Sequence, residues 1–124
     1  MFIGTPAMNT VAAHVVENGH RTLDIGGAQI ELVDSRRLQG LAGEVVMGVR
    51  PEDVRFASHG MAGLATAVES LGYERLVTCE LSVGGTSVVR IDAREPCPAR
   101  GSVVYLAPDP DAITLFDSAT GRRL

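Results

Sequence analysis

Residues 77–91 read Val-Thr-Cys-Glu-Leu-Ser-Val-Gly-Gly-Thr-Ser-Val-Val-Arg-Ile, and this stretch decides the fold class. Apolar and polar side chains alternate along its first half, which predicts a half-buried β-strand. The apolar face comprises Val77, Cys79, Leu81 and Val83. Gly84-Gly85 turns the chain into a return strand whose apolar positions are Val89 and Ile91. A two-residue loop would point both away from the core, so we predict an odd loop or a bulge at the glycines.

The rest of the chain repeats this pattern of short apolar runs separated by turn residues. Asn18-Gly19 and Gly26-Gly27 predict hairpin turns within a small meander of residues 10–33. Residues 34–43 read as a loop, and the next apolar alternation leads into Arg50–Val54. Further strands are expected at 45–49, 102–106 and 113–116. No segment keeps a helical period for three turns, so the sequence predicts an all-β barrel or sandwich of short antiparallel strands.

Proline at position 51 shapes the segment between two of these strands. It holds Arg50 extended and favours a tight turn or one helical turn, with Glu52 and Asp53 in the first turn. Downstream, His59-Gly60 and Gly63 predict a junction between two lobes. The chain of 124 residues fits one ordinary domain or two small packed lobes, for which we expect residues 10–60 and 61–124.

Composition excludes several functions. All 11 basic residues are arginines, so the chain lacks the lysine of a phosphate-binding Gly-Lys-Ser/Thr loop and of Schiff-base chemistry. The net charge of −4, with cations spread along the sequence, argues against a nucleic-acid partner. Five scattered aromatic residues predict no stacking platform for bases or sugars.

No pattern of chemical groups predicts a catalytic or metal site. The three histidines have no metal-ligand spacing, and the carboxylates are scattered singly. Cys79 and Cys97 are expected to be reduced, structural residues.

Four segments stand in a recognisable order: residues 2–9, 48–54, 68–74 and 115–117, the last followed by Thr120-Gly121. Together they resemble the C-terminal regulatory domain of ATPase subunits from ABC importers of the maltose and glycerol-phosphate type. The resemblance covers essentially the whole chain. It implies an OB-like β-barrel that contains a transport-associated oligomer-binding (TOBE) segment.

The resemblance also implies that a missing N-terminal domain carries out the ATP hydrolysis of the subunit. Residues 1–9 would be the exit segment from that nucleotide-binding domain, which would bind ATP and magnesium, so Met1 is expected to be a truncation start. The chain itself would bind no cofactor and would not be an enzyme. The whole subunit would be cytoplasmic and peripheral on the inner face of the cell membrane.

The resemblance implies that this part of the subunit binds other proteins. Two such domains pair and restrain opening and closing of the nucleotide-binding domains, which contact the membrane subunits; some relatives also receive regulatory proteins. The residues expected to carry family-specific structure or partner contact are Arg50, Pro51, Glu52, Asp53, Gly72, Tyr73, Glu74, Phe116 and Asp117.

Two alternatives stay open from the sequence. A self-standing oxyanion-binding β-barrel would hold an anion with arginines and backbone amides at a dimer seam. An enzyme acting on sugars would need two carboxylates that converge in a cleft.

Overall fold

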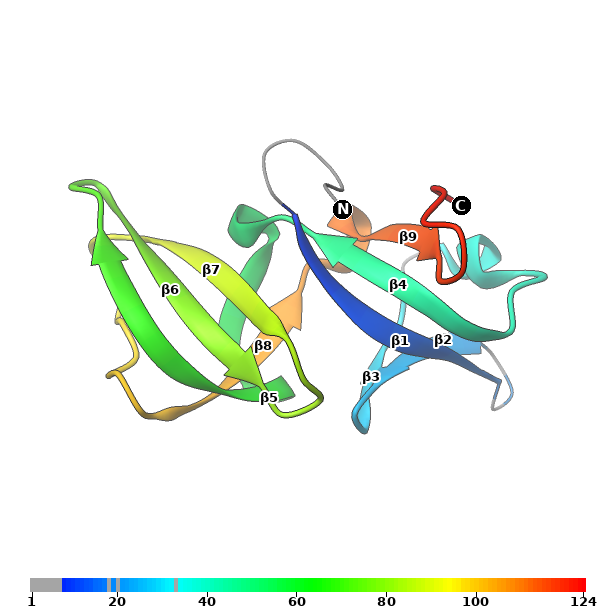
Figure 1. Cartoon of the computed structure of the whole chain (residues 1–124), viewed down its shortest axis with the longest axis horizontal. Coiled ribbons are helices and arrows are strands. Elements are labelled where there is room, and N and C mark those ends of the chain that lie inside the picture. The colour runs from blue at the N-terminus through cyan, green and yellow to red at the C-terminus, as the bar shows by residue number, and fades with distance from the viewer. Residues whose placement is uncertain (1–7, 18, 20, 33) are drawn as a thin grey trace.

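The computed structural model describes residues 8–17, 19, 21–32 and 34–124, and these form two antiparallel β-sheets (Figure 1). The first sheet has the order β3-β2-β1-β4-β9, and the second has the order β7-β6-β5-β8. The first sheet comprises β1 (Asn9–Glu17), β2 (Arg21–Ile25), β3 (Ala28–Ile30), β4 (Gly43–Val49) and β9 (Thr114–Asp117). The second comprises β5 (Val54–Ser70), β6 (Glu74–Leu81), β7 (Thr86–Asp92) and β8 (Val103–Pro108).

Three short 3-10 turns complete the described part of the chain: η1 (Ser35–Leu38), η2 (Pro51–Asp53) and η3 (Pro110–Ala112). No helix among the described residues has the length and apolarity of a membrane span. The all-β prediction is therefore confirmed.

The predicted meander is present at the start of the chain. Strand β1 pairs with β2, and β2 pairs with β3, both antiparallel. Ile25 lies opposite Ala28, so Gly26 and Gly27 alone form the connecting turn, with φ values of 59° and 94°. These left-handed angles suit glycine and match the twist of a hairpin.

The loop between β6 and β7 has the predicted odd length. Val77 lies opposite Val89, so Val89 and Ile91 are buried. Burial of Val83, however, was predicted wrongly: its side chain is 47% exposed. Val83 lies beyond the strand, in the turn, where its side chain reaches the first sheet at Gly26 and leaves no room there for a Cβ atom.

Strand β5 has 17 residues and passes through the predicted lobe junction. It pairs with β6 on one side and β8 on the other, and its register is irregular between Phe56 and Met61. Its glycines allow close approach of neighbouring strands: a Cβ on Gly63 would lie 2.7 Å from the carbonyl oxygen of Glu80, and one on Gly60 would meet the Leu106 carbonyl.

The chain changes sheets between β4 and β5, and β9 returns to the first sheet. The division into residues 10–60 and 61–124 therefore stays a prediction about domains, while the sheets themselves share chain from both ranges.

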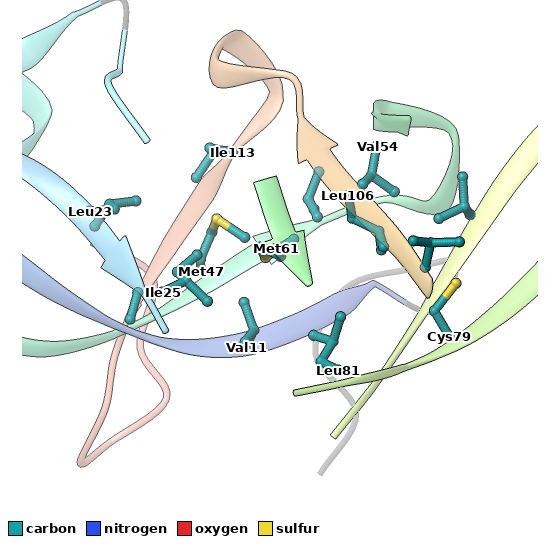
Figure 2. Close-up of a cluster of buried hydrophobic side chains, with 14 of the residues drawn as sticks. Val11, Leu23, Ile25, Met47, Val54, Met61, Cys79, Leu81, Leu106 and Ile113 are labelled. Carbon is teal, nitrogen blue, oxygen red and sulfur yellow. The ribbon is translucent and has the colours of Figure 1, made fainter. Parts of the chain in front are cut away.

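One continuous hydrophobic core joins the sheets (Figure 2). Val11 and Met47 contribute from the first sheet, and Met61, Leu81 and Leu106 contribute from the second. Residues 34–43 also contribute, in contrast to the expected plain loop. They contain η1, whose Leu38 is fully buried and whose first turn is capped by the Asp34 carboxylate, which accepts a bond from the Arg36 N–H.

The Asn9 side chain links the two sheets at their edges. Its Nδ2 donates to the Val88 carbonyl and its Oδ1 accepts from the Val88 N–H, both at 2.8 Å. Asn9 begins β1, while Val88 lies in β7, an edge strand of the second sheet. One amide therefore pairs with the strand edge as a backbone residue of a neighbouring strand would.

Replacing Asn9 with alanine leaves the Val88 N–H and carbonyl without these partners. We expect Asn9→Ala to lower the free energy of unfolding by about 1–3 kcal/mol, measured by urea denaturation. Gln29→Ala removes an exposed amide on β3 and is the matched control, with an expected change within about 0.5 kcal/mol. Equal effects of the two substitutions would contradict the link.

The two free cysteines are expected to differ in reactivity. Cys79 is fully buried, and burial raises the pKa of its thiol to about 11, whereas Cys97 is half-buried. Since the thiolate is the reactive form, an alkylating reagent should label Cys97 in the native protein and Cys79 only after unfolding, as read by mass spectrometry. Equal native labelling rates would show this account of the core to be wrong.

Candidate functional site: a groove at the junction of the sheets

A groove of about 280 Å³ lies where the two sheets meet. Its lining is mostly apolar and comprises Met8, Asn9, Pro51, Glu52, Leu76, Val88 and Arg90. Strands β6 and β7 supply Leu76, Val88 and Arg90, and η2 supplies Pro51 and Glu52. We call this the junction groove.

The η2 wall of the junction groove forms for local reasons. Arg50 is extended (φ −75°, ψ 153°) before Pro51, and the Asp53 N–H closes the turn on the Arg50 carbonyl at 2.9 Å. The sequence predicted a tight turn or one helical turn here, and the structure shows one 3-10 turn with Glu52 and Asp53 in it. The Asp53 carbonyl also accepts a bond from the Asp109 N–H at 2.8 Å, which ties η2 to the chain beyond β8.

Arg90 brings a positive charge to the junction groove. Its Nε is buried without a hydrogen-bond partner, and the Glu74 Oε2 lies 3.5 Å away, at ion-pair distance but beyond a normal hydrogen bond. Both side chains are about 40% exposed, 38% for Arg90 and 45% for Glu74. The pair therefore orients the guanidinium but contributes little stability.

The expected site residues lie in three segments, 50–53, 72–74 and 116–117. The structure brings the first two segments together at the junction groove. Pro51 and Glu52 line the junction groove, and Glu74 reaches the same groove through Arg90. Gly72 and Tyr73 form the adjacent turn between β5 and β6, where Gly72 has φ 87° and Tyr73 is 90% exposed.

The third place is the C-terminal end of the first sheet. Phe116 is buried opposite Val46 of β4, and its ring lies against Gly48, where a Cβ would be 2.8 Å from the ring. The Met8 side chain also contacts the Gly48 position, and Met8 lines the junction groove. Phe116 is thus anchored in the core and connects to the groove through Met8.

Asp117 shapes a turn at the end of β9. Its Oδ1 accepts bonds from the backbone N–H groups of Thr120 and Ala119, at 2.9 and 2.8 Å. These bonds hold the pKa of the Asp117 carboxyl below its ordinary value. Asp92, at the end of β7, is similar: bonds from Arg94 lower its pKa to about 2. Both shifts arise in exposed turns, away from the junction groove.

Sequence reasoning missed Asn9, Val88 and Arg90 as a connected set. Asn9 and Val88 are 79 residues apart, and their pairing has no local signal. Within the described residues, no group of three or more His, Cys, Asp or Glu side chains is placed to hold a metal ion. The groove therefore offers shape, apolar contact and a few charges.

Family models match most of the chain. Residues 4–54 match the MalK OB fold domain, and residues 47–116 match the TOBE domain.

Curated relatives align with nearly the whole chain. The sn-glycerol-3-phosphate import ATP-binding protein UgpC of Pectobacterium atrosepticum is 32% identical over 126 residues, which are 99% of this chain and 34% of the relative. The trehalose/maltose import ATP-binding protein MalK of Thermococcus litoralis is 34% identical over 137 residues, again 99% of this chain and 36% of the relative. The chain thus spans about a third of the length of these relatives.

A solved structure shares the fold. The cytoplasmic molybdate-binding protein ModG, crystallised with molybdate bound, superimposes with a TM-score of 0.69 over 91% of this chain and 98% of its own, at 17% identity. At this identity the likeness confirms the OB-like fold alone. With the TOBE model matched over residues 47–116, the resemblance found in the sequence is confirmed: this chain belongs to the TOBE domain family, with a MalK-type OB fold segment preceding it.

Proposed function

We propose that this chain is the regulatory part of the ATP-binding subunit of an ABC importer for a carbohydrate or a glycerol-phosphate-like solute. The observation that carries the proposal is the alignment of 99% of the chain with import ATP-binding proteins of several organisms. Those relatives are about three times as long, so ATP and magnesium would bind in the part that this chain does not match.

The chain's own residues do not match the phosphate-binding loop of an ATPase. Without lysine, the sequence cannot form the phosphate-binding loop of such ATPases. This part would instead bind other proteins. It would pair with a second copy, restrain closure of the nucleotide-binding domains and, in some transporters, bind a regulatory protein. The subunit would act at the inner face of the cell membrane, against the transporter's membrane subunits.

The junction groove is suited to passing on movement from a preceding domain. Met8 lines the groove, and Asn9 directly follows it and is bonded to β7. A pull on the chain before Met8 would therefore act on both sheets at once. Because the two sheets share one core, the response would be a rigid displacement of this whole part.

The oxyanion-binding alternative is disfavoured at the groove by charge. Glu52 lines it and Glu74 faces Arg90, so two carboxylates oppose the approach of an anion to that guanidinium.

A chimeric transporter tests the proposal. This chain would replace the matching third of the sn-glycerol-3-phosphate import protein UgpC of Escherichia coli, to which it is 33% identical. In cells that lack UgpC, we expect the chimera to restore uptake of radiolabelled glycerol 3-phosphate, whereas UgpC truncated before this part should not. A chimera that accumulates at the membrane and hydrolyses ATP, yet imports no more than the truncated protein, would contradict the proposal.

Arg90→Met in the same chimera tests the groove. Methionine keeps the apolar stem in contact with the groove floor but removes the charge that faces Glu74. We expect solute imported per ATP hydrolysed to fall at least about twofold, with normal protein levels. Arg100→Met, at an exposed arginine outside the groove, is the control, and an equal ratio in both variants would refute a role for Arg90 in coupling.

A further inference from the structure

We propose that the turn between β6 and β7 is a clasp that fixes the angle between the two sheets, with Val83 as its locking residue. The inference rests on the proposed function, because a fixed angle lets a displacement before Met8 move both sheets as one body. Asn9 and Val88 join the sheets at one point of the seam between β1 and β7. Val83 meets Gly26, in the β2–β3 turn, at a second point (Figure 1).

Val83 occupies a space that exists because position 26 is a glycine. A Cβ atom on Gly26 would overlap Cγ1 of Val83 and would lie 3.6 Å from its Cβ. The backbone of Gly26, with φ 59°, is also in the left-handed region that favours glycine. Gly27 has the same kind of backbone, with φ 94°, yet no described atom comes within 4 Å of its Cβ position. The contact is therefore specific to Gly26.

The tip that carries Val83 is held firmly to the second sheet. The Gly84 N–H donates to the Leu81 carbonyl at 2.9 Å, which closes the turn. The Ser82 N–H donates to the Ala62 carbonyl of β5 at 3.0 Å, which ties the tip to a second strand. These bonds set the backbone on both sides of Val83. Its side chain therefore moves away from the β2–β3 turn only if the second sheet moves with it.

A second point of attachment matters because side chains do not fill the whole seam. The junction groove lies beside the Asn9–Val88 bonds. A further cavity of about 230 Å³ is lined by Ala12 and His14 of β1 and by Val83 of the clasp. The shared core attracts the sheets to each other, but apolar attraction is non-directional. One point of attachment allows rotation about it, whereas two separate points prevent that rotation.

An exchange of side-chain size tests the clasp. Residual dipolar couplings, measured by NMR, report the orientation of each sheet, and both sheets of the unsubstituted chain should share one alignment tensor. Val83→Ala removes the locking methyl groups, and Gly26→Ala puts a methyl group where Cγ1 of Val83 lies. Each should make the tensor magnitudes of the two sheets differ by at least about 1.5-fold. In Gly26→Ala/Val83→Ala the two Cβ atoms would be 3.6 Å apart, an ordinary contact, and the common tensor should return.

Two controls match these substitutions. Gly27→Ala imposes the same kind of backbone strain without the collision, and Val68→Ala shortens a valine of β5 that is exposed to a similar extent as Val83. Both should keep one tensor. A common tensor in Val83→Ala, or a double variant that behaves like Gly26→Ala, would overturn the clasp. Equal behaviour of Gly26→Ala and Gly27→Ala would also overturn it, because strain in the β2–β3 turn would then explain the result.

A disulfide separates the clasp from the importer assignment. The Cβ separation of 3.6 Å suits a disulfide, so in the Cys97→Ser background oxidation should join Gly26→Cys/Val83→Cys at least about tenfold faster than Gly27→Cys/Val83→Cys, as read by mass spectrometry. Equal rates would contradict the contact.

The same cross-link can be placed in the UgpC chimera, reconstituted in liposomes with the membrane subunits. A clasp that stays closed predicts equal glycerol 3-phosphate import per ATP hydrolysed before and after oxidation. A fall in this ratio would show that the angle has to change, which overturns the clasp. A chimera that imports nothing in either state would overturn the importer assignment, and the alignment tensors would still decide the clasp.

Discussion

The structure depends on one side-chain amide that closes a sheet edge. Asn9 satisfies both the N–H and the carbonyl of Val88, two groups that an edge strand leaves open. An alanine at position 9 would leave them to solvent. Because Asn9 begins the first sheet and Val88 belongs to the second, the same two bonds fix how the two sheets meet.

The junction groove follows from this constraint. With β1 held against β7, Pro51 and Glu52 close over Val88 and Arg90, and a groove of about 280 Å³ remains between them. Phe116 reaches it indirectly, since its ring and the Met8 side chain meet at Gly48. Most of the residues that the family resemblance singled out thus belong to one connected structure.

Much of the fold could be predicted because its signals are local. The alternation at residues 77–91 fixed the parity of the β6–β7 loop, and Gly26-Gly27 and Pro51 predicted their turns. Strand β5 was missed because Gly60 and Gly63 read as chain breaks, although they permit close approach of Leu106 and Glu80. The burial of two residues was predicted wrongly because neither lies in a strand. Val83 is exposed in the turn after β6, and Leu38 is buried by the η1 turn within an expected loop. The pairing of Asn9 with Val88 spans 79 residues, which no local pattern reports.

Exchange of the Val88 amide proton tests the central claim most directly. This N–H points away from β6 and has Asn9 Oδ1 as its acceptor. By NMR, the account predicts that it exchanges roughly a hundredfold more slowly than in an unfolded chain, and that Asn9→Ala removes most of this protection while other β7 amides keep theirs. Exchange of the Val88 amide at the unfolded rate in the unsubstituted protein would contradict the account.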